Sequence, residues 1–441
     1  MRERLMIRSG NRKRFYLLLT LLLGLVLIRY SLLIPIPRPV FLGIILLILL
    51  LGDGDEILAM CLCCIPLQES IDFFYAVVFC LGVYLFKYHR KIRINMTVFP
   101  ILLMVVWELL HCLGEDFGVM EFLTNMIPLL ALAVFMSADV SDVDYDFVIR
   151  ALVFTTAMVC LSLLVRVLYL ANFNIWSAFA KLERLGLDAE ETRKTSGIAG
   201  GEINSNTLGV LCILAAAGLM QLRTVGRGNR KDLLLAATLL IFGSLTASRT
   251  YLVCLVFMLT LLLFSQKGTV KQKLKFLGGM LLVLLLALVV LYLVFPELME
   301  YFYSRFLEAD ITTGRIGIMG LYHRFIWSSP RHLAFGIGLQ DFGEKVTQVY
   351  RVSRNVPHNG IQELVIAWGV PGFVLFAGMW ILMIWRSRKF SGRQTLLNYI
   401  PLLVILLKSQ AGQMLNSAYT MLAFAYAYLS MCQRFSETQT Q

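Results

Sequence analysis

Apolar runs close to 20 residues long recur along this chain, from Phe15 to Tyr428. An α-helix needs about 20 apolar residues to cross the ~30 Å hydrocarbon core of a membrane. Of the 441 residues, 58% are hydrophobic and only 15% are charged, and the mean hydropathy is +0.74. The apolar share is higher, and the charged share lower, than in ordinary soluble domains. The pattern predicts an all-α polytopic membrane protein without a separate soluble catalytic domain.

Lys and Arg collect in short segments, and these segments predict the orientation of the spans. Six lie before residue 15, and four lie in each of the segments 87–93, 223–231, 267–275 and 386–393. Short loops rich in Lys and Arg stay in the cytoplasm, so both termini are expected there. Counting spans between basic segments places the remaining loops outside, at 114–121, 171–204, 248–249 and 296–357. The net charge of +12 then reflects loops that meet anionic lipid headgroups, and nucleic acid is not implied.

The number of spans depends on residues 40–51 and 57–67, two short apolar runs on either side of the polar segment 52–56. They form either two thin spans or one re-entrant pair, which gives roughly 12–14 transmembrane helices. The expected organisation is a cytoplasmic basic N-terminus (1–14), transmembrane helices with short loops (15–295), a long extracytoplasmic loop (296–357), C-terminal transmembrane helices (358–432) and a cytoplasmic tail (433–441).

Two patterns are reminiscent of metal sites. Asp53-Gly54-Asp55 places two carboxylates where they can share a divalent cation. The same pattern is the Asp-x-Asp metal motif of glycosyltransferases that use nucleotide sugars. No soluble nucleotide-binding domain accompanies it here, so a polar turn between thin spans is favoured. Cys61, Cys63 and Cys64 lie in an apolar run, whereas zinc sites pair cysteines in polar turns. These cysteines are interpreted as small apolar packing residues, and no metal or other cofactor is predicted.

The segment 296–357 is far longer than the two to eight residues or so that usually join neighbouring helices. It therefore predicts a folded lid or a binding element outside the membrane. Three polar motifs are expected on this side: Ser248-Arg249-Thr250, Thr312-Thr313-Gly314-Arg315 and Val356-Pro357-His358-Asn359. Gly336 and Gly338 are not followed by a strand-turn-helix unit and are interpreted as residues of a tight turn rather than a nucleotide fingerprint.

The three motifs share a chemistry suited to a charged phosphate ester. A guanidinium group offers bidentate hydrogen bonds to phosphate, so Arg249 and Arg315 together are able to hold a pyrophosphate without a metal ion. His358 is able to take a proton near neutral pH. Each residue also has a purely structural interpretation: Arg249 as a snorkelling side chain at a helix end, Arg315 as a solvated loop charge and His358 as a helix cap.

The order of these motifs resembles that of the O-antigen ligase and polymerase superfamily. The matching residues are 201–206 (Gly-Glu-Ile-Asn-Ser-Asn), Ser248-Arg249-Thr250, Gly314-Arg315, Gly336-Ile337-Gly338, His358-Asn359 and Gly369-Val370-Pro371-Gly372. They extend from Gly201 to Gly372, a stretch that includes the long outer segment 296–357. The N-terminal half matches only as generic spans.

The resemblance implies an integral-membrane glycosyltransferase of the bacterial cytoplasmic membrane, which needs no metal and uses a polyprenyl-pyrophosphate-linked glycan as donor. Arg249 and Arg315 would hold the pyrophosphate, and His358 would orient or deprotonate a hydroxyl of the acceptor glycan. Asn206 and Asn359 are expected as polar supports. The candidates for glycan contact are Tyr322, His323 and Arg324. Direct attack by the acceptor would invert the anomeric centre.

Within this family a polymerase of lipid-linked repeat units, for capsule, exopolysaccharide or O-antigen, is favoured, because nothing in the sequence identifies a distinct acceptor. A ligase that passes a finished glycan to another acceptor stays open. A transporter or flippase of lipid-linked glycans is the alternative from a different class, although no internal repeat is evident and the polar motifs gather on the outer side. Expected partners are the glycan donor, the acceptor glycan and membrane lipids, with a flippase and a chain-length regulator as further candidates.

Overall fold

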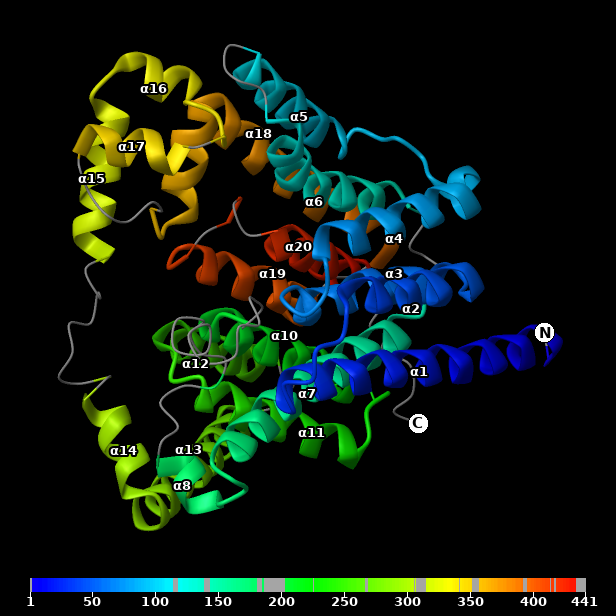
Figure 1. Cartoon of the computed structure of the whole chain (residues 1–441), viewed down its shortest axis with the longest axis vertical. Coiled ribbons are helices and arrows are strands. Elements are labelled where there is room, and N and C mark those ends of the chain that lie inside the picture. Colours follow the sequence, from blue (N-terminus) through cyan, green and yellow to red (C-terminus); the bar gives the residue numbers. More distant parts are fainter. Residues whose placement is uncertain are drawn as a thin grey trace.

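The computed structural model of this protein describes most of the chain (Figure 1). The described residues are 2–113, 118–138, 143–180, 185, 203–224, 226–265, 269–304, 306, 315–340, 342–350, 357–391, 395–412, 414–415 and 418–433. Parts of the expected outer segments and motifs lie outside the described residues, namely 114–117, 181–184, 186–202, 307–314 and 351–356, as does the C-terminal tail from 434.

Within the described residues all regular secondary structure is helical, apart from an isolated β-bridge between Ile92 and Ala138. The helices of the bundle are α1 (Arg2–Ser31), α2 (Arg38–Leu51), α3 (Gly54–Leu67), α4 (Phe73–Tyr88), α5 (Phe99–Cys112), α6 (Val119–Ser137), α7 (Tyr145–Leu170), α10 (Ser205–Thr224), α11 (Arg230–Leu245), α12 (Arg249–Ser265), α13 (Val270–Val294), α18 (Gly360–Ser391), α19 (Leu396–Ser409) and α20 (Ala418–Cys432). Shorter helices are η1 (His89–Lys91), α8 (Ile175–Ala180), α14 (Pro296–Tyr303), α15 (Arg315–Trp327), α16 (Pro330–Phe335) and α17 (Phe342–Tyr350).

Helix length and composition confirm a membrane protein. In the described part of the chain, five helical segments are long and apolar enough to cross a membrane: Arg12–Ser31 of α1, α6, α7, α10 and Gly360–Phe390 of α18. Shorter apolar helices are α2, α4, α5, α12 and α19. The protein is therefore all-α with membrane-spanning helices, and the total of roughly 12–14 spans stays a prediction.

The two short apolar runs near the N-terminus are separate helices, α2 and α3, joined by a capped turn. Asp53 accepts hydrogen bonds from the backbone N–H groups of Asp55 and Glu56, both at 3.1 Å. Glu56 in turn accepts one from the N–H of Asp53 at 3.0 Å. This reciprocal capping box satisfies donors that a helix start leaves unpaired. The Asp53-Gly54-Asp55 pattern thus begins a helix.

Residues of several basic segments meet at one end of the bundle. Arg12 pairs with Asp144, which precedes α7. The ammonium group of Lys87 donates to the carbonyl oxygens of Leu50 and Gly52, at 2.7 and 2.9 Å. Figure 1 shows the start of α1 at this end, with α8 and α14 to α17 at the opposite end. The location of both termini in the cytoplasm and the side of the membrane that each end faces stay predictions.

The centre of the bundle is formed by α3, α10 and α20, which are buried along most of their described length. Helix α3 packs against α4 and α7, α10 against α7, α11, α12 and α19, and α20 against α6, α18 and α19. Cys61, Cys63 and Cys64 lie buried within α3 as small packing residues. These three helices fix the positions of the loops that follow or precede them at the outer end.

The described part of the segment 296–357 is largely helical and folded. Tyr322 and Phe325 of α15 pack with Phe342 and Val346 of α17 in a small apolar cluster that also includes Ile366 of α18. Helix α16 lies against α18 as well. The outer helices α15 to α17 are therefore attached to the bundle through α18.

The attachment depends on a break in α18. Three glycines with positive φ shape it: Gly336, Gly338 and Gly369, at 78°, 78° and 66°. The N–H groups of Ile337 and Gly338 donate to the carbonyl oxygens of Ile366 and Ala367, at 2.9 and 2.8 Å. Carbonyls released at a helix break need such donors in a membrane protein, because lipid supplies none. Gly336 and Gly338 have the positive φ that a change of chain direction favours, and the segment they belong to docks onto the broken helix.

Glu108 of α5 binds both the segment after Gly338 and α18. Its side chain is only 1% exposed, and its carboxylate accepts hydrogen bonds from the N–H of Leu339, at 2.9 and 3.1 Å, and from Nε1 of Trp368, at 2.6 Å. A buried carboxylate is tolerated only when donors compensate it, so these bonds are strong constraints on position. Helices α5 and α18 and the 336–339 turn thus form one unit.

Replacing Gly369 by Ala is expected to destabilise the protein. A Cβ atom there would lie 2.8 Å from the carbonyl carbon of Ala334, and the left-handed conformation alone costs an L-residue about 1–2 kcal/mol. The thermal unfolding midpoint of detergent-purified protein should fall. Gly378→Ala is the matched control in the same helix, because nothing lies within 4 Å of a Cβ there. Equal midpoints for the two variants would contradict this account of the joint.

Candidate functional site

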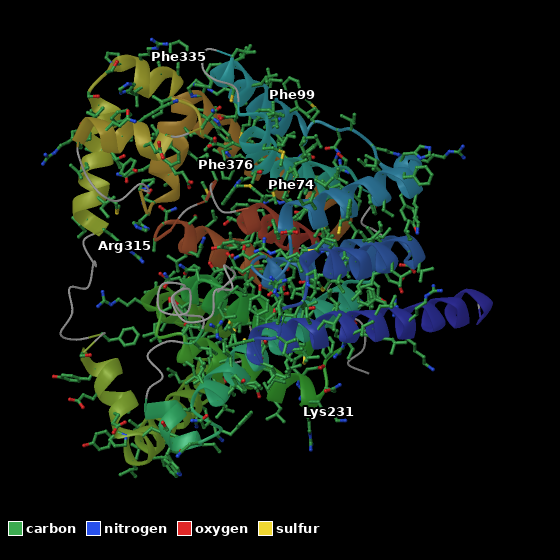
Figure 2. All side chains as sticks on the ribbon, viewed as in Figure 1. Phe74, Phe99, Lys231, Arg315, Phe335 and Phe376 are labelled. Atoms are coloured by element: carbon green, nitrogen blue, oxygen red, sulfur yellow. The ribbon has the colours of Figure 1, made fainter. Side chains whose placement is uncertain are left out.

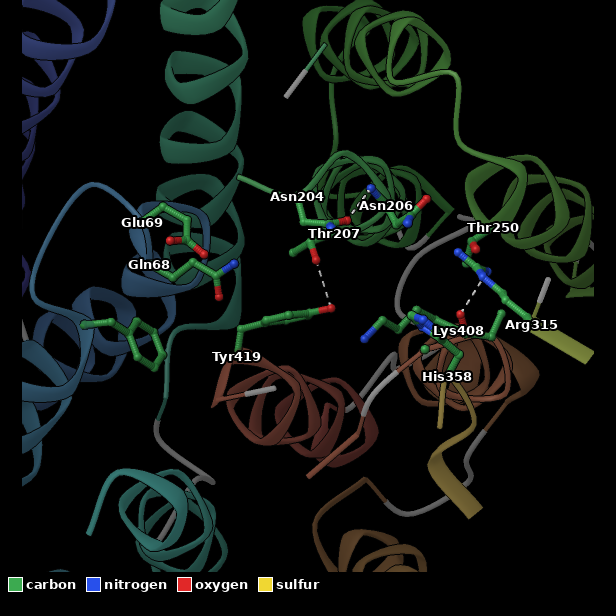
Figure 3. A pocket seen from close by; sticks show the side chains of 13 residues that line it. Gln68, Glu69, Asn204, Asn206, Thr207, Thr250, Arg315, His358, Lys408 and Tyr419 are labelled. Atoms are coloured by element: carbon green, nitrogen blue, oxygen red, sulfur yellow. Dashed lines mark hydrogen bonds between the residues drawn. The ribbon is translucent and has the colours of Figure 1, made fainter. Parts of the chain in front are cut away.

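A cavity of about 410 Å³ opens where the outer ends of several helices meet (Figure 3). Its walls come from the α3–α4 turn and from segments at the ends of α10, α12, α15, α18, α19 and α20. The lining residues are Gln68, Glu69, Phe73, Asn204, Asn206, Thr207, Thr250, Arg315, His358, Lys408, Ala411, Gly412 and Tyr419. Two of the three predicted catalytic residues, Arg315 and His358, are therefore brought together in one cavity.

Arg315 is the first residue of α15, and it reaches across to the loop that follows α19. Its Nη1 donates to the carbonyl oxygen of Ala411 at 3.2 Å. Figure 2 shows Arg315 at the start of α15. A cation at a helix N-terminus is unfavourable for the helix dipole, so helix stability does not explain this placement. A guanidinium group and a helix N-terminus together favour an anion in the cavity.

His358 lies in the turn before α18 and adopts φ of 49°, which is rare for a residue with a side chain. Its neighbour Asn359 caps the helix, because its Oδ1 accepts from the N–H groups of Ile361 and Gln362, both at 3.0 Å. The Asn359 Nδ2 donates to the carbonyl oxygen of Gln410 at 3.3 Å. Asn359 is thus a polar support that holds His358 against the cavity, and the strained backbone is maintained by its surroundings.

Lys408, near the end of α19, is a lining residue that the sequence analysis missed. Its side chain is only 5% exposed, and its Nζ lies 4.6 Å from the centre of the Tyr419 ring. The Tyr419 hydroxyl accepts a hydrogen bond from Thr207 at 3.0 Å. An ionisable side chain in a membrane helix is costly and is typical of functional positions. A single Lys in an otherwise apolar run was the signal available in the sequence.

A second buried carboxylate holds the loop that carries the rest of this wall. Glu363 of α18 is fully buried and accepts hydrogen bonds from the N–H groups of Met414 and Leu415, the latter at 3.0 Å. These bonds tie Met414 and Leu415, which follow α19, to α18. This clamp keeps Ala411 and Gly412 beside Arg315 and His358.

The motifs around Asn206 and Ser248 meet where α10 and α12 begin. The Ser248 Oγ donates to Oδ1 of Asn206 at 2.6 Å, and the Asn206 N–H donates to Oδ1 of Asn204 at 2.9 Å. Arg249 begins α12 and is half-buried. Its neighbour Thr250 lines the cavity, whereas Arg249 is not among the lining residues. The expected pairing of Arg249 and Arg315 across one ligand stays a prediction.

The three candidates for glycan contact do not line this cavity. Tyr322 is buried in the apolar cluster of α15 and α17. His323 and Arg324 are exposed on α15, and the His323 ring lies 6.1 Å from that of Trp327. Distance along the helix explains this, because Arg315 faces the cavity from the first turn of α15 while these residues lie about two turns, or roughly 10 Å, further along its axis.

Gln68, Glu69 and Phe73 form a wall that the sequence analysis also missed. Gln68 and Glu69 lie in the turn between α3 and α4, and Phe73 begins α4. The Tyr30 hydroxyl donates to the carbonyl oxygen of Glu69 at 2.8 Å. Burial raises the pKa of the Glu69 carboxyl above its usual value, and the positive charge of Arg38 nearby opposes this shift. No motif marks this turn in the sequence, and only tertiary packing brings it to the site.

The charges of the cavity are divided between two sides. In Figure 3, Lys408, His358 and Arg315 lie on one side, and Gln68 and Glu69 lie on the other, with Thr207 and Tyr419 between them. The first side suits a polyanion and the second suits a neutral, hydrogen-bonding group.

A scan against models of known protein families finds no match to this chain, and a search of the curated proteins finds none either.

Loss of either cavity cation is expected to weaken the binding of inorganic pyrophosphate. Arg315→Gln and Lys408→Met should each raise its Kd by about 10- to 100-fold, because one hydrogen bond to a charged group contributes about 1.5–3 kcal/mol. Isothermal titration calorimetry in detergent would measure this. Arg324→Gln is the matched control, since Arg324 is exposed on the same helix and does not line the cavity. An equal loss in the control would point to general surface charge.

Proposed function

We propose that this protein is a membrane glycosyltransferase that polymerises polyprenyl-pyrophosphate-linked oligosaccharide repeat units. The observation that carries the proposal is the convergence of Arg315, His358 and Lys408, from α15, the turn before α18 and α19, on one cavity. The motif order that resembles the O-antigen ligase and polymerase superfamily supports the same activity. The protein would act at the outer face of a bacterial cytoplasmic membrane, in the synthesis of capsule, exopolysaccharide or O-antigen.

The proposed reaction asks little of the protein beyond cations and positioning. An acceptor hydroxyl attacks the anomeric carbon of the donor glycan, the bond from that carbon to the pyrophosphate oxygen breaks, and polyprenyl pyrophosphate leaves with the electron pair. Arg315 and Lys408 would offset the charge that develops on the leaving oxygen. Holding donor and acceptor together supplies much of the remaining acceleration.

His358 lies beside the two cations in this proposal. Its imidazole is suited either to donate a hydrogen bond to a phosphate oxygen or to accept the proton of the acceptor hydroxyl. Arg249, one residue before the lining residue Thr250, would contribute to the field that draws the pyrophosphate into the cavity. No part of this scheme requires a redox cofactor.

His358→Ala, Arg315→Ala and Lys408→Ala are each expected to abolish long glycan chains in a host whose surface polysaccharide depends on this protein. Single repeat units on the lipid carrier should accumulate, because the donor is still made and can no longer be extended. Gel sizing of the glycan measures the result, with an immunoblot to confirm normal protein levels. Arg331→Ala is the control, since Arg331 is exposed on α16 and does not line the cavity, and it should leave chain length unchanged.

Other outcomes would redirect the proposal. Long chains that persist on the lipid carrier but fail to reach their final acceptor would indicate a ligase. Repeat units that accumulate on the inner side of the membrane would indicate a flippase. Wild-type chain lengths in all three variants would remove the cavity from the reaction.

A further inference from the structure

The two-sided cavity raises the question of which group removes the proton from the attacking hydroxyl. In a one-step displacement the acceptor oxygen approaches the anomeric carbon from the side opposite the departing pyrophosphate oxygen. A base for the acceptor and cations for the leaving group therefore belong on opposite walls, just as the general base and the general acid of inverting glycosidases lie on opposite faces of the sugar. In Figure 3, His358 shares the side of Arg315 and Lys408, and Glu69 lies across from them.

We infer that Glu69 is the catalytic base that accepts the proton of the acceptor hydroxyl, within an acceptor-sugar subsite formed with Gln68 and Phe73. This inference rests on the proposed glycosyl transfer. As the new bond forms between the acceptor oxygen and the anomeric carbon, the hydroxyl proton passes to a carboxylate oxygen of Glu69. The pyrophosphate oxygen leaves with the electron pair toward Arg315 and Lys408. Glu69 then releases its proton to solvent.

The turn that carries Glu69 is rigidly held. The Tyr30 hydroxyl binds the carbonyl oxygen of Glu69 at 2.8 Å, and the N–H of Ser70 donates to the carbonyl oxygen of Leu67, also at 2.8 Å. At the far end of the turn, Arg38 pairs with Asp72 at 2.9 Å. The backbone around Glu69 is thereby fixed from both sides, which is what a base needs in order to meet a hydroxyl at hydrogen-bonding distance.

The side chain of Glu69 is by contrast available. In the part of the chain that the structure describes, its carboxylate accepts no hydrogen bond, although the residue is half-buried against the cavity. Burial raises its pKa, which brings the carboxylate closer to the basicity that favours proton abstraction near neutral pH. Asp72 in the same turn differs, because its carboxylate is engaged by Arg38.

The neighbours of Glu69 suit a sugar rather than a phosphate. Gln68 offers an amide that both donates and accepts, as vicinal sugar hydroxyls require, and Phe73 offers an apolar face on which a pyranose ring is able to stack. The amide of Asn204 lines the same cavity. A carboxylate in this wall disfavours an anionic group on the acceptor sugar at the point of attack.

The test uses purified full-length protein and, as probe, the lipid-linked single repeat units extracted from a host strain that lacks the protein. Glu69→Gln should lower the single-turnover rate of transfer by at least about 100-fold, the typical contribution of a general base. The Kd for inorganic pyrophosphate should change less than twofold, because the cation side is untouched. Glu344→Gln is the matched control, since Glu344 is exposed on α17 and does not line the cavity, and it should retain the rate within about threefold.

The pH profile separates Glu69 from His358 as the base. A base acts deprotonated, so the wild-type rate should fall on acidification through the pKa of Glu69, at a higher pH than for a free carboxyl because that pKa is raised. The charged groups that face it are Arg38 and Asp72 in and near its own turn, Tyr30 on α1, and Arg315, His358 and Lys408 across the cavity. The fall should vanish in Glu69→Gln and persist in His358→Gln.

Opposite results would overturn the inference in distinguishable ways. If Glu69→Gln keeps more than a third of the wild-type rate and the acid limb vanishes in His358→Gln, His358 is the base and the proposed function stands. If Glu69→Gln loses pyrophosphate binding together with the rate, while Glu69→Asp restores both, its role is structural. If the wild-type protein transfers no glycan from the probe, the proposed function fails, and the assignment of Glu69 fails with it.

Discussion

The break in α18 at Gly369 is the constraint on which the outer end of this protein depends. A helix that ends inside a membrane protein leaves carbonyl groups that must find donors. Here the donors are the N–H groups of Ile337 and Gly338. Because Ile337 and Gly338 belong to the outer segment, the hydrogen bonds that satisfy the free carbonyl groups of α18 also attach the outer segment to the bundle. The position of Arg315, at the start of α15, follows from this docking.

Two buried carboxylates extend the same principle. Glu108 binds the 336–339 turn and Trp368, and Glu363 binds the loop after α19. Each uses a costly buried charge to hold backbone N–H groups that no regular helix satisfies. Both partners of each bond are far apart in sequence. The segments around the cavity are therefore held by buried hydrogen bonds to carboxylates, whereas the helices of the bundle are held by apolar packing.

The parts of this architecture that the sequence predicts are those encoded locally. Apolar runs predict the helices, and the glycines at 336 and 338 predict a tight turn because their conformation is a local property. The convergence of Arg315 and His358 is foreseen from motif order. Lys408 and Glu69 are missed because each is a single residue in an ordinary context, and only the packing of α3, α19 and α20 brings it to the cavity. The turn of α15 that carries Tyr322 packs inward for the same reason.

The burial of Lys408 bears on how the cavity is used. A snorkelling Lys at the end of a membrane helix extends toward water, yet this side chain is 5% exposed and lies over the Tyr419 ring. Tyr419 is in turn held by Thr207 at the start of α10. A desolvated ammonium group gains more from an incoming anion than a hydrated one, because less water has to be displaced when the ion pair forms. Under the proposed function, the buried Lys408 would favour the entry of a pyrophosphate group, and Glu69 on the opposite wall would face the acceptor sugar.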